Sequence, residues 1–404
     1  MPLPAYLVVE PPRQTRSSFL PKLHSRRVPL PALFDIGKLV LQTQHFSPFV
    51  LTTVPGGAGG GKLGNSAEYI GPLGTLSHLG AASEKKEMVG SSTLVFSEPE
   101  DFETALGAEG CIGLWITGPG GFRARLVQVL LHRLRLSTIE EQLPRVVFIA
   151  VPADMVMMSF PIGIGTAPVY GGMVMRSGEV MTLGPGQRMH ARTDGPCSWG
   201  TIWFPLKELV QNGRALTGAP FAVPPFVQCW RPPQAAGKDL FRLHAAGIRI
   251  AEIRPRALAD AEAAHGLEQQ MIHALVECLT VASTDVGTVA ARQHRDIMVR
   301  FEHLLQTEPH RNMRMVEISA ALGVSERLLR ILCVKHLGMS GKHYLRVRRM
   351  SLVRRALRHG NGQAAGVAAV ARDYGFADAR RFAVEYRALF GELPSTTLRR
   401  LRPK

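Results

Sequence analysis

The stretch VAAVARDYGFADARRFAVEYRALFG, Val367–Gly391, joins a short apolar helix pattern to an amphipathic helix pattern that ends in glycine. Between the two, Gly375 can take the positive φ that ends the first helix, and Phe376 can fill the angle between the helices. Asp378 is a suitable N-cap for the second helix. This order of features predicts a helix-turn-helix unit.

The stretch VEISAALGVSERLLRILCVKHLG, Val316–Gly338, has the same pattern, with Gly323 at the end of its first helix and Ser325 as the N-cap. The following residues of this copy correspond to residues 52 or 53 positions later: Ile318, Leu322, Gly323, Val324, Leu329, Cys333, Leu337 and Gly338. The sequence therefore predicts two helix-turn-helix units, at 315–338 and 367–391.

The second helix of each unit has an apolar side and an outward side. At about 100° per residue, Leu329, Leu332 and Cys333 share the buried side of the first copy, and Phe382 and Tyr386 that of the second. A helix-turn-helix presents the other side to the major groove of DNA. The residues predicted to contact DNA are Arg327, Arg330, Ile331, Val334, Lys335, Arg380, Arg381, Val384 and Arg387.

The segment HYLRVRRMSLVRRALRHG, 343–360, lies between the two copies and carries six arginines. A single helix here would hold the two units at a fixed separation, and successive major grooves on one side of DNA lie about 34 Å apart. The residues expected to contact DNA phosphates are Lys342, His343, Arg346, Arg348 and Arg349. The alternative is a basic helix that is merely solvated.

This region resembles the DNA-binding domain of the AraC/XylS family of bacterial transcription regulators. The family's most recognisable segment is an apolar-Ala-x-x-x-Gly-Phe start followed by F-x-x-x-[FY]-[KR]-x-x-F-G-x-x-P. It is matched by Val370, Ala371, Gly375, Phe376, Phe382, Tyr386, Arg387, Phe390, Gly391 and Pro394. The resemblance covers residues 300–400 and implies an all-helical domain that binds promoter DNA and, in most members, activates transcription through contact with RNA polymerase.

The first unit departs from the family pattern at two places. Ile331, Leu332, Cys333 and Val334 stand where relatives commonly carry Arg-Leu-Phe-Arg, and Gly341 stands where a proline is usual. Ile331 and Val334 can contact thymine methyl groups but cannot neutralise phosphate. The second unit is therefore expected to carry more of the electrostatic affinity for DNA.

The charge of the chain is concentrated in its last quarter. The 404 residues carry a formal net charge of +16, of which 21 basic and 8 acidic residues give +13 to residues 300–404 and leave +3 for the first 299. Such a domain favours a polyanionic partner. No signal peptide or membrane-spanning segment is indicated, and five scattered cysteines suggest neither a disulfide framework nor a zinc site, so a cytoplasmic location is expected.

The fold class predicted for the whole chain is α+β. Residues 1–90 read as irregular or flexible, 91–226 as a strand-rich effector-sensing domain, 238–299 as a helical linker or dimerisation region, and 300–404 as the DNA-binding domain. The strand-rich part is similar in character to the cupin-like β structure that often precedes this domain in the family. One helix is predicted within it, over 122–143.

An apolar stripe runs along the helix predicted from Leu258 to Ala282. Its members are Leu267, Met271, Leu275, Val276 and Leu279. Two alternatives remain for this stripe: it packs within its own domain, or it forms a homodimer interface.

A small-molecule effector is expected from the domain order, and Met173, Met175, His190, Trp199 and Trp203 are the candidate residues of its pocket. No metal or other cofactor is predicted, since His190 has no second ligand at a suitable spacing. The segment GGAGGGKL from Gly56 resembles a phosphate-binding loop, but Leu63 stands where a magnesium-binding Ser or Thr is required.

No catalytic constellation can be isolated from the sequence, so the chain is not expected to be an enzyme. The function indicated is a sequence-specific transcription regulator, and the family resemblance implies that it activates promoters. The alternative is an architectural DNA-binding protein that needs no effector.

Overall fold

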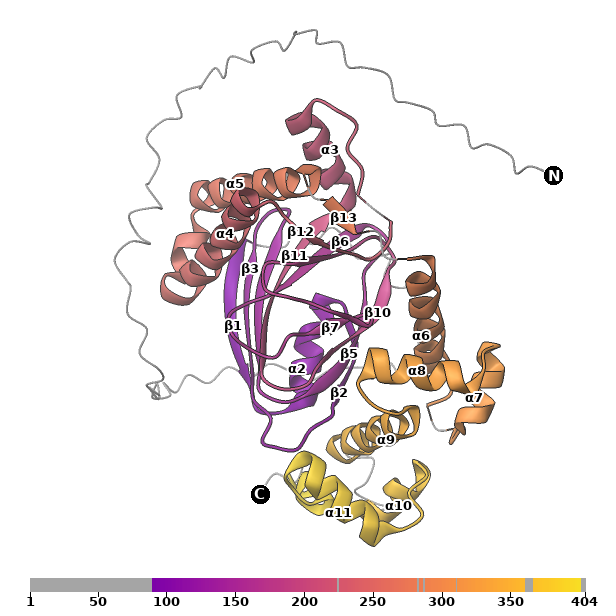
Figure 1. Cartoon of the computed structure of the whole chain (residues 1–404). Helices are drawn as coiled ribbons and strands as arrows, with labels where there is room; N and C mark the ends of the chain where they lie inside the picture. The colour runs from indigo at the N-terminus through magenta and orange to yellow at the C-terminus, as the bar shows by residue number, and fades with distance from the viewer. Residues whose placement is uncertain are drawn as a thin grey trace, which may run out of the picture. The chain divides into compact units, whose positions relative to one another are not determined.

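The computed structural model describes residues 89–223, 225–281, 283–285, 288–309, 311–359 and 366–400. Its strand-rich part consists of two antiparallel sheets (Figure 1). The larger has the order β1 (Gly90–Phe96), β3 (Ala124–Leu130), β4 (Arg135–Glu141), β11 (Cys197–Pro205), β6 (Met155–Pro161), β9 (Val180–Leu183), β12 (Gln228–Arg231), β13 (Ser283–Asp285). The smaller has the order β2 (Cys111–Ile116), β5 (Arg145–Ala150), β10 (Arg188–Thr193), β7 (Val169–Tyr170), β8 (Met173–Val174).

The two sheets enclose one hydrophobic core, and helices cover their outer faces. Strand β5 shows the alternation, because Val147 and Ile149 join the core between the sheets while Val146 and Phe148 join a second core with the C-terminal helices. Successive side chains of a strand point to opposite faces. A strand that is buried on both faces is therefore apolar at nearly every position.

The prediction of a helix over 122–143 is wrong. This segment forms β3 and β4, which pair with each other in an antiparallel register from Ala124 opposite Glu141 to Leu130 opposite Arg135. Leu126 lies in the core between the sheets, whereas Val127 and Val129 lie in the core outside the larger sheet. Because both faces of β3 are covered, its apolar residues lack the period of two that would have marked a strand.

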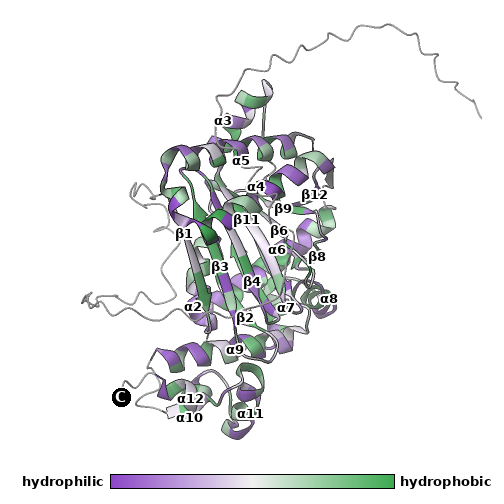
Figure 2. Cartoon of the chain, turned by 90° about the vertical axis from the view of Figure 1, so that its left-hand side faces the viewer, coloured by the Kyte–Doolittle hydropathy of each residue, from purple (hydrophilic) through white to green (hydrophobic). Residues whose placement is uncertain are grey.

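Two long helices, α4 (Gln234–Ile253) and α5 (Ala261–Val281), pack on the outer face of the larger sheet. In Figure 2 both are banded with hydrophilic and hydrophobic residues, as amphipathic helices with one face on a sheet should be. Leu267, Met271, Leu275 and Val276 are buried in this core and Leu279 packs against it. The apolar stripe predicted in this region thus packs within the chain.

Shorter helices complete this part of the fold. They are α2 (Pro99–Leu106), the 3-10 helix η2 (Gly107–Glu109), α3 (Leu206–Thr217) and the 3-10 helix η3 (Pro255–Ala259). Residues 1–88, which include the glycine-rich segment around Lys62 and nearly all of the predicted irregular region, lie outside the described residues.

The C-terminal part is helical, as predicted. Its helices are α6 (Val289–Thr307), α7 (Met315–Leu322), α8 (Glu326–Leu337), α9 (Gly341–Arg358), α10 (Gly366–Asp373), α11 (Ala379–Phe390) and α12 (Pro394–Arg399). Helices α6 to α9 share a core with the outer face of the smaller sheet, and α9 to α12 form a further core. The fold is therefore α+β. Among the described helices, none is both long and apolar enough to cross a membrane.

Candidate DNA-binding surface

The first helix-turn-helix unit consists of α7 and α8. Gly323, which follows α7, has a φ of 68°, and its N–H donates to the carbonyl groups of Ser319 and Ala320. Ser325 caps α8 by accepting a hydrogen bond from the N–H of Leu328. These two residues take the roles that the sequence predicts for them, because a left-handed conformation favours glycine and a free N–H at a helix start favours a hydroxyl acceptor.

Helix α8 turns the predicted sides inward and outward. Leu329, Leu332 and Cys333 are fully buried, as is His336. Ile331 and Val334 are each 53% exposed. Arg327, Arg330 and Lys335 are exposed beside them. The outward side of α8 thus has a cationic and an apolar part.

Lys335 lies at the edge of this surface, next to the smaller sheet. A Cβ built on Gly172, in the β7–β8 turn, would lie 3.0 Å from both Cγ and Cε of Lys335. Gly172 has a φ of 82°, so both its conformation and this close approach favour glycine. The C-terminal end of α8 therefore lies against the strand-rich part, whereas the outward residues of the N-terminal half of α8, such as Arg327 and Arg330, are exposed.

The second unit consists of α10 and α11 and has the same local design. Gly375 has a φ of 82°, and Asp378 accepts hydrogen bonds from the N–H groups of Arg380 and Arg381, each at 3.0 Å. Phe382 and Tyr386 are buried, and their ring centroids lie 5.5 Å apart. Aromatic contacts of this kind fix the angle of α11 on the core.

The outward side of α11 matches that of α8. Val384 is 66% exposed, at the position that corresponds to Ile331. Arg380, Arg381 and Arg387 are exposed around it. The guanidinium of Arg381 donates through Nε to the half-buried Glu385 carboxylate at 2.9 Å, so this nitrogen must exchange its partner if it is to bind DNA.

Helix α9 joins the two units (Figure 1). Of the five residues predicted to contact phosphate, Lys342 and His343 are exposed at its first turn. Arg346 donates to Glu385 at 2.5 Å, and Arg349 donates to the amide oxygen of Asn312 at 2.9 Å. Both of these arginines are half-buried and keep part of their surface open.

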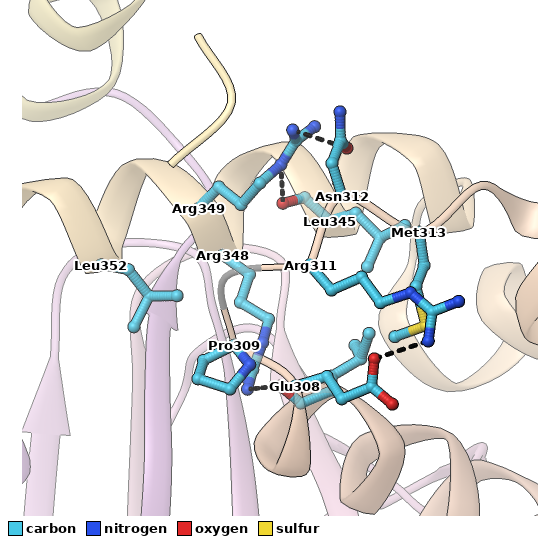
Figure 3. A pocket seen from close by; sticks show the side chains of 10 residues that line it. Glu308, Pro309, Arg311, Asn312, Met313, Leu345, Arg348, Arg349 and Leu352 are labelled. Atoms are coloured by element: carbon cyan, nitrogen blue, oxygen red, sulfur yellow. Dashed lines mark hydrogen bonds and ion pairs between the residues drawn. The ribbon is translucent and has the colours of Figure 1, made fainter. Parts of the chain in front are cut away.

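The prediction that Arg348 contacts phosphate is wrong for this structure. Its side chain is only 8% exposed and donates to the Glu302 carboxylate at 2.7 Å and to the Leu305 carbonyl at 3.0 Å. Figure 3 shows Arg348 and Arg349 leaving α9 in different directions, Arg349 toward Asn312 and Arg348 inward. The hollow beside them has a volume of about 20 Å³, room for roughly one water molecule.

Glu302, on α6, is the centre of a buried polar network that joins the two parts of the fold. Besides Arg348, its carboxylate accepts from the Tyr344 hydroxyl at 2.8 Å and lies 3.2 Å from Nε2 of His190 on β10. Burial opposes ionisation of Glu302, but the charge of Arg348 and the hydrogen bonds from its neighbours outweigh it and lower the pKa. The network therefore contains a buried carboxylate that stays charged.

The five residues predicted to line an effector pocket do not share one cavity. His190 points out of the smaller sheet into the Glu302 network, while Met175, Trp199 and Trp203 belong to the core between the sheets, and Met173 packs at its edge. The indole N–H of Trp199 donates to buried Glu141, and that of Trp203 to buried Glu109, each at about 2.7–2.8 Å. Both tryptophans thus have structural roles.

Sequence reasoning missed the partner of the second half of α9. The carboxylates at the start of α2 face its arginines: Arg354 lies 2.5 Å from Glu98 and 3.0 Å from Glu100, and Arg358 lies 2.7 Å from Glu100. Arg355 pairs with Glu103 in the same way. The run EPEDFE, 98–103, was visible as an acidic segment, but nothing local shows which basic segment it meets.

Gly341 and Cys333, at which the first unit departs from the family pattern, lie next to each other. A Cβ on Gly341 would come within 2.5 Å of Cε of Met315 and 3.1 Å of Sγ of Cys333. In the second unit, the corresponding Pro394 occupies the start of α12 and Tyr386 takes the place of Cys333. Gly341 therefore leaves room for Met315, which fills space beside the small Cys333 side chain.

Comparison with known proteins gives matches centred on these helices. Residues 318–400 match a family described as a helix-turn-helix domain. The XylDLEGF operon transcriptional activator 1 of Pseudomonas putida is 37% identical over 105 residues, which cover 26% of this chain and 32% of the relative. The XylDLEGF operon transcriptional activator 2 of the same organism is 32% identical over 124 residues, 31% of this chain and 77% of the relative.

Among solved structures, that of the AraC-like transcriptional activator CuxR is similar over 65% of this chain and 95% of its own, at 15% identity and a TM-score of 0.34. The matched region spans about a third of the length of the first of the Pseudomonas putida relatives. It spans 77% of the second, at 32% identity. The chain belongs to the AraC/XylS family of transcription regulators.

Proposed function

We propose that the chain is a sequence-specific DNA-binding transcription regulator, an activator of promoters that responds to a small-molecule effector. The observation that carries this proposal is the match between the outward sides of α8 and α11. Each presents arginines around an exposed apolar residue at a corresponding position, Ile331 in α8 and Val384 in α11, and α8 has Val334 as a second such residue. Arginine can read guanine and anchor phosphate, and an apolar side chain can contact a thymine methyl group.

The partners proposed are double-stranded promoter DNA, RNA polymerase and a second copy of the chain, in the cytoplasm of a bacterial cell. Related proteins described as operon transcriptional activators support the first two. A homodimer would need a surface other than the stripe on α5, which is buried against the larger sheet.

The Arg381→Ala variant of the full chain is expected to bind its promoter more weakly by about 1–3 kcal/mol, because a bidentate arginine contact is worth that much. The measurement is a titration of labelled promoter DNA at fixed salt concentration. Arg214→Ala is the matched control, since Arg214 is an exposed arginine on α3, outside the helical C-terminal part. Equal affinity of the Arg381→Ala protein and the control would refute the proposed reading face.

Arg327→Ala is expected to weaken binding less than Arg381→Ala. Each unit has three outward cations, but Lys335 of the first lies at the edge of its surface beside Gly172, and Val334 stands where the second unit has Arg387. The slope of log affinity against log salt should change by roughly one for each phosphate contact that is lost. Equal losses and equal slopes for the two variants would count against this ranking.

A map of bound sites across the genome separates the regulator from an architectural DNA-binding protein. The regulator should occupy a few strong sites that share a sequence. Many weak sites with no common sequence would favour the architectural alternative.

A further inference from the structure

Glu385 is a carboxylate within the second helix of the second unit, beside the exposed Val384. Its side chain is 27% exposed. The position that corresponds to it in the first unit, 53 residues earlier, is occupied by Leu332, which is fully buried. A carboxylate beside a surface that binds DNA repels phosphate and weakens binding to every sequence. Its place on α11 therefore calls for a role that offsets this repulsion.

The two oxygens of the Glu385 carboxylate hold two arginines from different helices. Oε1 accepts a hydrogen bond at 2.9 Å from Nε of Arg381, which lies one turn earlier in α11. Oε2 accepts from Nε of Arg346, in α9, at 2.5 Å and also contacts Nη2 of the same guanidinium. Burial opposes ionisation of Glu385, but the hydrogen bonds from the two arginines outweigh it and lower the pKa. The carboxylate is therefore charged and joins α11 to α9.

Arg346 is the anchored member of this group. Its side chain is 32% exposed, and its guanidinium carbon lies 5.8 Å from the ring centroid of Phe376. Phe376 is buried in the turn between α10 and α11 and belongs to the core of the second unit. The attraction between a cation and an aromatic face adds to the ion pair. Arg346 thus fixes Glu385 relative to both α9 and this turn.

Arg381 is the exposed member, with 70% of its side chain open. Its Nε is engaged by Glu385, whereas its terminal nitrogens Nη1 and Nη2 have no hydrogen-bond partner in the part of the chain that the structure describes. A guanidinium holds its N–H groups in one rigid plane, so an ion pair at Nε restricts the directions that the two terminal nitrogens can take. Two such parallel donors match the O6 and N7 acceptors of guanine in the major groove.

We propose that Glu385 is a positioning residue for sequence reading: anchored by Arg346, it holds Arg381 so that Nη1 and Nη2 meet a guanine end-on. The inference rests on the proposed function and adds the residue that makes the second unit selective. In the first unit, Arg327 and Arg330 are exposed, and no described carboxylate pairs with them. Ordering these two side chains on DNA costs conformational entropy, so the second unit discriminates more strongly between sequences.

The experiment titrates two labelled duplexes with the full chain at one salt concentration: promoter DNA, and DNA of the same length and composition in scrambled order. Glu385→Gln keeps the size of the side chain and removes its charge. Affinity for the promoter should fall, because Arg381 is no longer held for a bidentate contact, and affinity for the scrambled duplex should rise, because repulsion of phosphate is relieved. The ratio of the two affinities should fall about fivefold or more, since a bidentate contact discriminates by about tenfold or more.

Glu326→Gln is the matched control, since Glu326 is an exposed carboxylate in the first turn of α8. It also removes one negative charge near the proposed surface, so it should change both affinities alike and leave their ratio as it is. The thermal unfolding midpoint of each variant shows that the chain is folded at the temperature of the titration.

A double substitution separates positioning from a structural effect. If Glu385 acts through Arg381, adding Glu385→Gln to Arg381→Ala should not lower the ratio further. Arg346→Gln, which removes the anchor, should lower the ratio on its own. An unchanged ratio in Glu385→Gln, or a further fall in the double variant, overturns the inference. The unchanged chain tests the proposed function separately: if it does not prefer the promoter, both ideas fail, and if it does, an unchanged ratio in Glu385→Gln rejects the positioning role alone.

Discussion

Replacing Glu302 with alanine is expected to lower the free energy of unfolding by about 3–5 kcal/mol, because removal of one partner leaves the other charge buried and unpaired. The partner is Arg348, whose side chain is 8% exposed and whose guanidinium lies 2.7 Å from the carboxylate. Tyr344 and His190 would lose an acceptor as well. Urea denaturation of the full chain at neutral pH measures the loss.

Glu308→Ala is the matched control for this experiment. Glu308 also pairs with an arginine, Arg311, but its side chain is 39% exposed, and exposed pairs contribute about 0–1 kcal/mol. A Glu302→Ala protein as stable as the control would mean that water replaces the carboxylate and that the network does not hold α9 to the smaller sheet.

The ionisation of Glu302 gives the same network a pH dependence. Its pKa in the folded chain is lowered from the ordinary value of 4.5, so its ionised form stabilises the fold above that value. This contribution is lost as the pH falls through the folded pKa, because the unfolded chain then binds the proton more readily. We expect Glu302→Gln to flatten the fall of stability below about pH 4.5 relative to the unchanged chain; parallel acid-unfolding curves would contradict this.

The two helix-turn-helix units could be predicted because their signals are local. Gly323 and Gly375 have the positive φ, and Ser325 and Asp378 provide the caps, within a few residues of the helices they delimit. The period of 3.6 then separates the buried from the outward positions of α8 and α11 without knowledge of any other part of the chain.

The rest depends on distant partners. Arg348 and Arg346 carry the same charge on the same helix, yet one is buried because Glu302 lies beside it, 46 positions away. Arg354 meets Glu98 across 256 positions. The helix predicted in place of β3 was wrong for a related reason. The second apolar face of β3 packs in a core with α4 and α5, which come more than a hundred residues later.

Replacing Arg354 with methionine is expected to lower the free energy of unfolding by about 3 kcal/mol. The substitution removes the cation that lies between the carboxylates at the start of α2 and the carboxylate just before α12. Glu98, Glu100 and Glu392 lie 2.5, 3.0 and 2.7 Å from this guanidinium, which is 5% exposed. Arg358 and Arg400 remain as partial partners, which sets the loss toward the low end of the range for buried pairs.

Hydrogen exchange locates this effect, and a double substitution separates charge from packing. The amides of α2 should exchange faster in Arg354→Met, while those of α4 should not change, because α2 is held to α9 chiefly by these ion pairs. The control is Arg399→Met, a substitution of an exposed arginine on α12, which should leave both unchanged.

Adding Glu100→Gln to Arg354→Met should restore part of the stability, since a buried carboxylate that has lost its cation costs more than an amide at the same position. If the two substitutions were instead additive, Glu100 and Arg354 would not be coupled in the stability of the fold.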